Sequence, residues 1–125
     1  MSDMEKKNIN FSVKEVYFNA IESGAKTVEY RDGTNPYWWK KLCDLTRYGD
    51  KDIDTVMDEV RRGKMEFHPQ PYQTCTFWTT RKNNTRASLV IEWKDTVVHK
   101  GHSTFAVRLG DLLVDSNGKH IPKKK

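Results

Sequence analysis

The spacing of apolar residues changes along the chain, and this change predicts its main elements. Before His68, polar segments alternate with stretches in which apolar residues recur every three or four positions, as on one face of a helix. From His68 onward, β-branched and aromatic residues dominate, and polar loops containing glycine separate them. The pattern therefore predicts an α+β fold, with most helices in the first half and most strands in the second.

The first half is expected to hold three helices, over residues 14–26, 35–49 and 52–64. Gly24 suits the C-terminal cap of the first helix, because glycine adopts the left-handed conformation at little cost. Asn35 and Pro36 suit the cap and the first turn of the second helix. Gly63, which follows two arginines, suits the end of the third.

Apolar stripes indicate which helix faces should be buried. In the first helix the residues at helical spacing are Val16, Tyr17, Ala20 and Ile21. In the second helix they are Trp38, Leu42 and Leu45. These two stripes are expected to face the core.

Strands are expected over residues 9–14, 27–31, 72–80, 87–94 and 104–114. About five to six strands with two or three helices packed outside them suggest a sheet that curls into a small β-barrel. No repeat or change in composition divides the chain. We therefore expect one domain over residues 9–116, a flexible N-terminus over residues 1–8 and a basic tail over residues 117–125.

Composition limits the class of protein. Apolar residues make up 36% of the 125 residues, which is enough for a globular core and argues against a disordered chain. No apolar run approaches the roughly 18 to 20 residues needed to cross a bilayer, and the start of the chain lacks the apolar core of a signal peptide. We expect a cytoplasmic protein, with Cys43 and Cys75 buried and reduced.

The net charge of +5 is unevenly distributed. Residues 1–66 hold 12 Lys or Arg and 13 Asp or Glu, whereas residues 67–125 hold 10 and 4. A basic surface of this kind suits the phosphates of a nucleic acid, because neutralising them releases counterions. A basic surface that only keeps the protein soluble explains the charge equally well.

One short segment resembles a known family. Gly24, Lys26, Glu29 and Arg31 match the Gly-x-Lys-x-x-Glu-x-Arg signature of ASCH domains, and "TFAVRLGDLLV" is similar to the family's closing strand. The resemblance implies a PUA-like β-barrel with a cleft near the signature for RNA, another single-stranded nucleic acid or a modified base. The continuation "YRDGTNPYWWKKL" is similar to small stand-alone ASCH proteins of phages.

The signature also has a direct physical interpretation. On a strand, alternate residues share a face, so the expected surface residues are Thr27, Glu29 and Arg31 and the expected core residues are Val28 and Tyr30. Arg31 would offer a planar donor fork to a phosphate or a base edge, and Glu29 would hold that fork in place. Lys26 would add a mobile charge. A surface ion pair that only closes the turn is the alternative.

The second helix adds aromatic residues to this chemistry. Trp38 and Trp39 are adjacent, so they point roughly 100° apart and cannot both face the core. A surface Trp beside Lys40 and Lys41 would stack an unpaired base while the cations hold its phosphates. A Trp that covers the mouth of the barrel is an equally good interpretation.

The loop between the third and fourth expected strands is basic. It contains Arg81, Lys82 and Arg86 and has no acidic residue between Thr79 and Ser88. Such a hairpin tip suits contact with a nucleic-acid backbone, although a solvated turn has a similar composition. The main hypothesis is therefore a nucleic-acid-binding module with the signature as its floor and the tryptophans and this loop at its rim.

Catalysis is the first alternative. Some ASCH proteins that this chain resembles in the turn are amidohydrolases of N-acetylated cytidine, and they use a Lys, a Thr three residues later and a Glu from a distant strand. Here Lys26 is present, but Glu29 occupies the Thr position; the nearest hydroxyl is Thr27, and Glu92 is the carboxylate inside the later strands. A ribonuclease would use Lys26 with Glu29 or Glu92.

The remaining expectations concern partners and metals. A phage protein that binds a host protein is a further alternative. His99 and His102 are three residues apart, but no third ligand accompanies them, so we expect no metal site and no cofactor.

Overall fold

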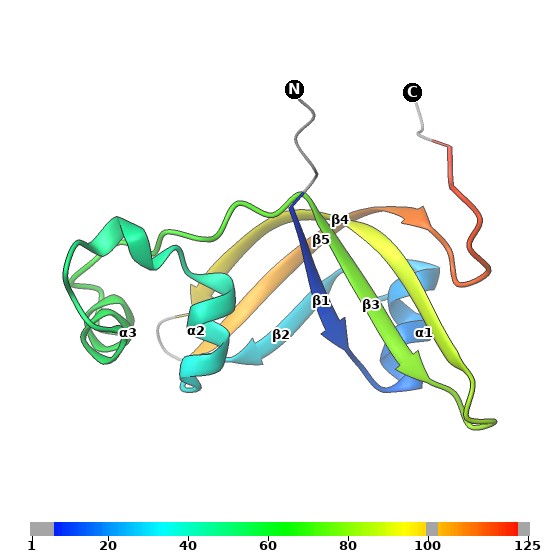
Figure 1. Cartoon of the computed structure of the whole chain (residues 1–125), viewed down its shortest axis with the longest axis horizontal. Helices are drawn as coiled ribbons and strands as arrows, with labels where there is room; N and C mark the ends of the chain where they lie inside the picture. Colours follow the sequence, from blue (N-terminus) through cyan, green and yellow to red (C-terminus); the bar gives the residue numbers. More distant parts are fainter. Residues whose placement is uncertain (1–6, 100–102, 123–125) are drawn as a thin grey trace. The chain divides into compact units, whose positions relative to one another are not determined.

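A five-stranded sheet is the framework of the fold. The computed structural model describes residues 7–99 and 103–122. The strands are β1 (Asn8–Ser12), β2 (Val28–Asp32), β3 (Thr74–Thr80), β4 (Arg86–His99) and β5 (Thr104–Val114), and their order in the sheet is β1-β3-β4-β5-β2 (Figure 1). The helices are α1 (Glu15–Ser23), α2 (Pro36–Leu42) and α3 (Ile53–Arg61), with a short 3-10 helix, η1 (Leu45–Tyr48). The described residues thus confirm the α+β class and the expected numbers of strands and helices.

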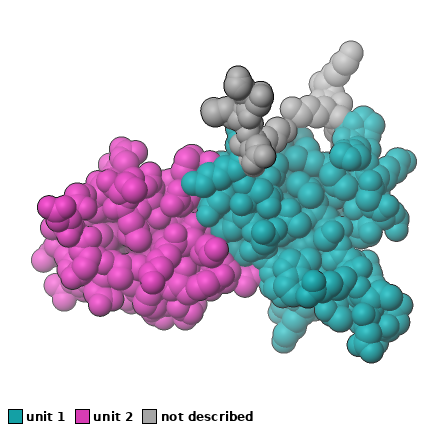
Figure 2. Space-filling model, viewed as in Figure 1, with its two compact units in different colours: residues 1–27, 72–94, 108–125 teal, residues 28–71, 95–107 magenta. Residues whose placement is uncertain are grey.

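The chain divides into two compact units. Unit 1 comprises residues 1–27, 72–94 and 108–125, and unit 2 comprises residues 28–71 and 95–107 (Figure 2). Strands β4 and β5 contribute residues to both units. None of the helices in the described ranges has the length and apolarity required to cross a bilayer.

Unit 1 is built on a mixed sheet. β1 runs parallel to β3, with Asn8 opposite Thr74, and β3 runs antiparallel to β4, with Thr74 opposite Glu92. Alternate residues of these strands are buried, and the rings of Phe11 and Phe77 stack 5.2 Å apart. Parallel neighbours need a long crossover, which the chain provides with the 61 residues that separate β1 from β3.

The face of α1 differs from the expected one. Phe18 and Ile21 are buried, whereas Val16 is 67% exposed and Tyr17 is 50% exposed. Apolar residues occupy more than half of the circumference of this helix, so its sequence alone does not select which part of that arc is buried. Packing of Phe18 and Ile21 in the core of unit 1 decides the orientation.

Unit 2 surrounds an aromatic core. Trp39 lies 4.9 Å from Phe105 and 6.0 Å from Phe67, as measured between ring centroids. The predicted single helix over residues 35–49 is wrong, because α2 ends at Leu42 and a separate turn, η1, begins at Leu45. The Asp44 carboxylate accepts from the Thr46 backbone N–H at 3.2 Å and caps this turn. The buried stripe of α2 is Trp39 and Leu42 rather than Trp38 and Leu45.

Candidate functional site

On strand β2, the burial of Glu29 and Tyr30 is the reverse of what the sequence predicted. Glu29 is only 7% exposed, whereas Tyr30 is 55% exposed and Val28 is half-buried. The expectation that Tyr30 faces the core and Glu29 the solvent is therefore wrong. A carboxylate is stable in such a place only when a cation or donors compensate its loss of water. Arg31, two residues along the same strand face, provides that compensation.

Arg31 is held from two sides. Its Nη2 lies 2.7 Å from Glu29 Oε2, and its guanidinium carbon lies 4.8 Å from the centre of the Trp38 ring. The Arg31 side chain is 18% exposed and that of Glu29 is 9% exposed. An ion pair at this depth is screened less than one on an open surface, and the stacked ring fixes the plane of the guanidinium.

The turn between β2 and α2 brings Trp38 to Arg31. Asp32 Oδ1 accepts from both the backbone N–H of Thr34, at 2.8 Å, and its hydroxyl, at 2.6 Å. These two bonds lower the pKa of Asp32, the side-chain bond being the larger cause. Asn35 then caps α2 by accepting from the Tyr37 N–H at 2.9 Å. The turn thus depends on two side chains that bind nearby backbone.

The two adjacent tryptophans have different roles. Trp39 is fully buried, and its Nε1 donates to the carbonyl of Gly33 at 2.7 Å. Trp39 is therefore part of the core and cannot stack a ligand, which corrects its assignment to the interface. Trp38 remains partly exposed, as expected for one of the pair, and lies on Arg31.

Further side chains of α2 extend this surface. Tyr37, 54% exposed, meets Trp38 edge to face at 4.9 Å between ring centroids, and the Lys41 ammonium lies 5.8 Å from the centre of the Tyr37 ring. Lys40 is exposed on the same short helix. We call Glu29, Arg31, Tyr37, Trp38 and Lys41 the aromatic–cationic cluster of unit 2.

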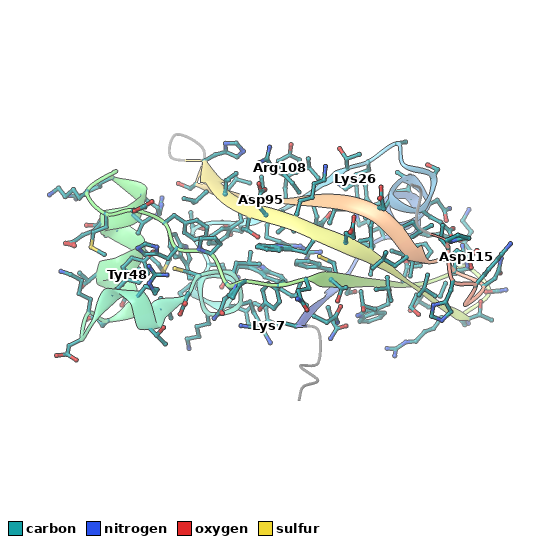
Figure 3. The ribbon with its side chains drawn as sticks, turned by 90° about the horizontal axis from the view of Figure 1, so that it is seen from above. Lys7, Lys26, Tyr48, Asp95, Arg108 and Asp115 are labelled. Atoms are coloured by element: carbon teal, nitrogen blue, oxygen red, sulfur yellow. The ribbon has the colours of Figure 1, made fainter. Side chains whose placement is uncertain are left out.

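Lys26 and Thr27 belong to unit 1. The ammonium of Lys26, which is labelled in Figure 3, lies 5.7 Å from the centre of the Tyr17 ring on α1. The Thr27 side chain is exposed, and its backbone carbonyl accepts from the N–H of Leu109 at 2.9 Å. The sequence did not identify Tyr17 as a neighbour of Lys26, because it placed Tyr17 in the core.

Glu92 has a structural contact on the strand beside it. Its Oε1 accepts from the backbone N–H of Asp111 at 2.9 Å. Gly110 provides the space for this contact, because a Cβ at that position would lie 2.6 Å from Glu92 Oε1. Gly110 thus accommodates the carboxylate of Glu92, which the sequence made a candidate catalytic residue of the hydrolytic alternatives.

The three basic residues of the β3–β4 hairpin differ from one another. Arg81 pairs with Glu15 of α1 at 2.8 Å and lies over the ring of Phe18, so it ties the hairpin to the helix. Arg86 is exposed, with its guanidinium carbon 4.4 Å from the centre of the Trp78 ring. Lys82 is exposed at the tip. The Trp78–Arg86 pair is a further aromatic–cationic contact, which sequence reasoning missed.

The remaining residues with distinctive chemistry are the two buried cysteines and the side chains that could bind a metal ion. Burial raises the pKa of Cys43 to about 11 and that of Cys75 to about 12, so both thiols are protonated at neutral pH. In residues 7–99 and 103–122, no three His, Cys, Asp or Glu side chains gather where they could hold a metal ion. His99 is exposed, and His102 lies outside the described residues.

Comparison of the chain with protein-family models, with curated proteins and with solved structures found no match.

Proposed function

We propose that this chain is an ASCH-like domain of the PUA-like class and that it binds RNA or another single-stranded nucleic acid through the aromatic–cationic cluster. The motif residues Gly24, Lys26, Glu29 and Arg31 support the family, and the five-stranded mixed sheet with helices supports the fold class. The enzyme alternatives involving Lys26, Thr27 and Glu92 gain no specific support, because the Glu92 Oε1 is engaged by the Asp111 N–H.

The observation that carries the proposal is the position of Arg31 between the Glu29 carboxylate and the Trp38 ring. A guanidinium held in this way loses little rotational freedom when it binds a phosphate or a base edge, so more of the interaction energy appears as affinity. Trp38 and the exposed Tyr37 offer ring surface to unpaired bases, and base stacking contributes about 1–3 kcal/mol per base. Lys40 and Lys41, in the last turn of α2, supply phosphate-binding charge.

The test is binding of fluorescent single-stranded RNA, single-stranded DNA and duplex DNA, measured by anisotropy at two salt concentrations. Arg31→Lys keeps a positive charge beside the buried Glu29 but removes the planar fork, and we expect affinity for the preferred single strand to fall about tenfold. Trp38→Ala removes the ring without changing charge, and we expect a loss of about 5- to 100-fold with little change in the salt dependence.

Arg47→Ala is the matched control. Arg47 is an exposed cation of unit 2 on η1, outside the cluster. The Arg47→Ala substitution removes one charge, so any change in affinity should be small. Circular dichroism checks that each variant is folded. The proposal is wrong if folded Arg31→Lys and Trp38→Ala proteins bind every probe as the unchanged protein does. Turnover of N-acetylcytidine or labelled RNA in the same samples would instead favour the hydrolytic alternatives.

A further inference from the structure

The three neighbouring strands β1, β3 and β4 of unit 1 bury one face and leave the other polar. The strands lie side by side (Figure 1), and residues directly opposite one another share a face. Phe11, Phe77 and Leu89 form one such row and are buried in the core. The rows on either side of it point the other way. We call their exposed or half-buried residues near the β3–β4 hairpin the polar sheet face, which comprises Ser12, Thr76, Trp78, Arg86, Ser88 and Val90.

Trp78 is the large aromatic residue of the polar sheet face. Its partners on the two neighbouring strands are Ser12 and Ser88, whose side chains are too short to cover the ring. Trp78 is therefore half-buried, whereas the adjacent Phe77 is fully buried. The Arg86 guanidinium carbon lies 4.4 Å from the centre of the Trp78 ring. The indole and the guanidinium thus form a stacked pair on an otherwise polar surface.

The cations at this end of the sheet have no acidic partner. Arg86 and Lys82 are exposed, and neither forms an ion pair within residues 7–99 and 103–122. Glu15, on α1, is already paired with Arg81. Glu92 is six residues beyond Arg86, which is about 20 Å on an extended strand and more than the Debye length of about 8–10 Å. The potential near Arg86 is therefore positive.

The hairpin that carries these cations is held by its own hydrogen bonds. The Arg81 N–H donates to the Thr85 carbonyl at 2.8 Å, and the Asn84 N–H donates to the Arg81 carbonyl at 2.8 Å. The side-chain oxygen of Asn83 accepts from the Thr85 N–H at 3.1 Å. Asn84 has φ of 65°, a conformation that asparagine adopts more readily than most residues. Because the tip is already ordered, binding a ligand there costs little loop entropy.

We propose that the polar sheet face is a second surface for single-stranded nucleic acid, on which a base stacks on the Trp78–Arg86 pair. Lys82 and the guanidinium N–H groups of Arg86 contact the adjacent phosphates. A guanidinium that stacks through its plane still presents its N–H donors at the edge, so it can serve both purposes. The inference rests on the proposed function for the class of ligand, but it assigns a surface in unit 1 rather than the aromatic–cationic cluster of unit 2.

The composition of the polar sheet face favours a nucleic acid over a protein partner. The centre of a protein–protein interface is rich in apolar side chains, whereas interfaces with nucleic acids are more polar and more positively charged. Apart from Trp78, the apolar residue of this face is Val90, which is half-buried. The hydroxyl groups of Ser88 and Thr76 are of the kind that bind phosphate and sugar oxygens.

The first test is an anisotropy titration of fluorescein-labelled RNA and DNA single strands of about eight nucleotides. The titration uses the Trp38→Ala protein, which lacks the stacked ring of the aromatic–cationic cluster. Trp78→Leu, made in this background, keeps an apolar side chain without an aromatic ring, and we expect affinity to fall about 5- to 100-fold. Trp78→Phe keeps a ring for stacking and should retain most of the affinity.

The second test concerns the phosphate contact and the position of the bound strand. Arg86→Ala should weaken binding and reduce the slope of log affinity against log salt concentration by about 0.7. Lys119→Ala removes an exposed cation of unit 1 outside the face and should change neither. In NMR spectra, the indole N–H signal of Trp78, assigned by its absence in Trp78→Phe, should shift when the strand is added. The signal of the fully buried Trp39 should stay in place.

The outcomes distinguish this inference from the proposed function. If folded Trp78→Leu bound every strand as its parent does, or if it and Trp78→Phe had equal effects, the ring would have no role in stacking and the inference would be wrong. An unshifted Trp78 signal, or equal effects of Arg86→Ala and Lys119→Ala, would also overturn it. If Trp38→Ala alone left affinity intact while Trp78→Leu lowered it, the polar sheet face would be supported and the aromatic–cationic cluster would be wrong. Absence of binding to any strand would overturn both.

Discussion

Replacing Gly33 with Ala should destabilise unit 2 more than a glycine substitution usually does. A Cβ at this position would lie 2.4 Å from the Ser103 carbonyl oxygen and 2.6 Å from its carbonyl carbon. Both are backbone atoms, which cannot turn away as a flexible side chain would. Gly33 also donates its N–H to that same oxygen at 2.7 Å, and its carbonyl accepts from Trp39 Nε1.

The expected loss of stability in Gly33→Ala follows from the backbone atoms that must move to make room for the new Cβ. Separating Gly33 from Ser103 would strain or break the Gly33 N–H bond, and leaving a buried donor without its acceptor costs about 1–3 kcal/mol. Overpacking a filled site also costs about 1–3 kcal/mol. The two costs do not simply add, because a movement that relieves the overlap between the new Cβ and the Ser103 carbonyl also lengthens the hydrogen bond of the Gly33 N–H. We therefore expect the free energy of unfolding to fall by about 2–4 kcal/mol.

Urea denaturation followed by tryptophan fluorescence measures this loss, with Gly24→Ala as the control. Gly24 has φ of 86° and no atom within 4 Å of an added Cβ, so its substitution carries only the backbone cost of about 1–2 kcal/mol. If Gly33→Ala proved no more destabilising than Gly24→Ala, at unchanged m-value, the steric reasoning would be refuted.

Two other predictions concern buried ionisable groups. Glu29→Gln should lower the free energy of unfolding by about 1–3 kcal/mol, because it leaves the Arg31 charge in a largely buried place; equal stability of the two proteins in urea titrations would contradict this. The raised pKa values of Cys43 and Cys75 mean that the folded state favours the protonated thiols. Their contribution to the free energy of unfolding is therefore complete below the unfolded-state pKa, and it is lost as the pH rises through about 9 toward 11 or 12. The protein should thus be less stable at pH 10 than at pH 8, and this loss of stability should be smaller in a Cys43→Ala, Cys75→Ala variant. If the variant lost as much stability as the unchanged protein, other groups would be responsible for the loss.

Much of the secondary structure was predictable because its signals are local. Gly24 has the left-handed conformation at the end of α1, Asn35 caps α2, and Gly63, with φ of 77°, follows α3. Each of these effects depends on the backbone within a few residues of the side chain, so the order of residues is enough to reveal it. The spans of β1, β2, β3 and β5 also agree closely with the alternation of apolar residues.

The orientation of the side chains was less predictable, and the candidate site depends on it. The sequence by itself determined that Glu29 and Arg31 share one face of a strand and that Trp38 and Trp39 diverge on a helix. Only the tertiary structure decided that Glu29 is buried, that Trp39 rather than Trp38 enters the core, and that Arg86 lies on Trp78. The physical reason is that burial depends on which elements pack together, and those elements, such as β1 and β3, are far apart in the chain.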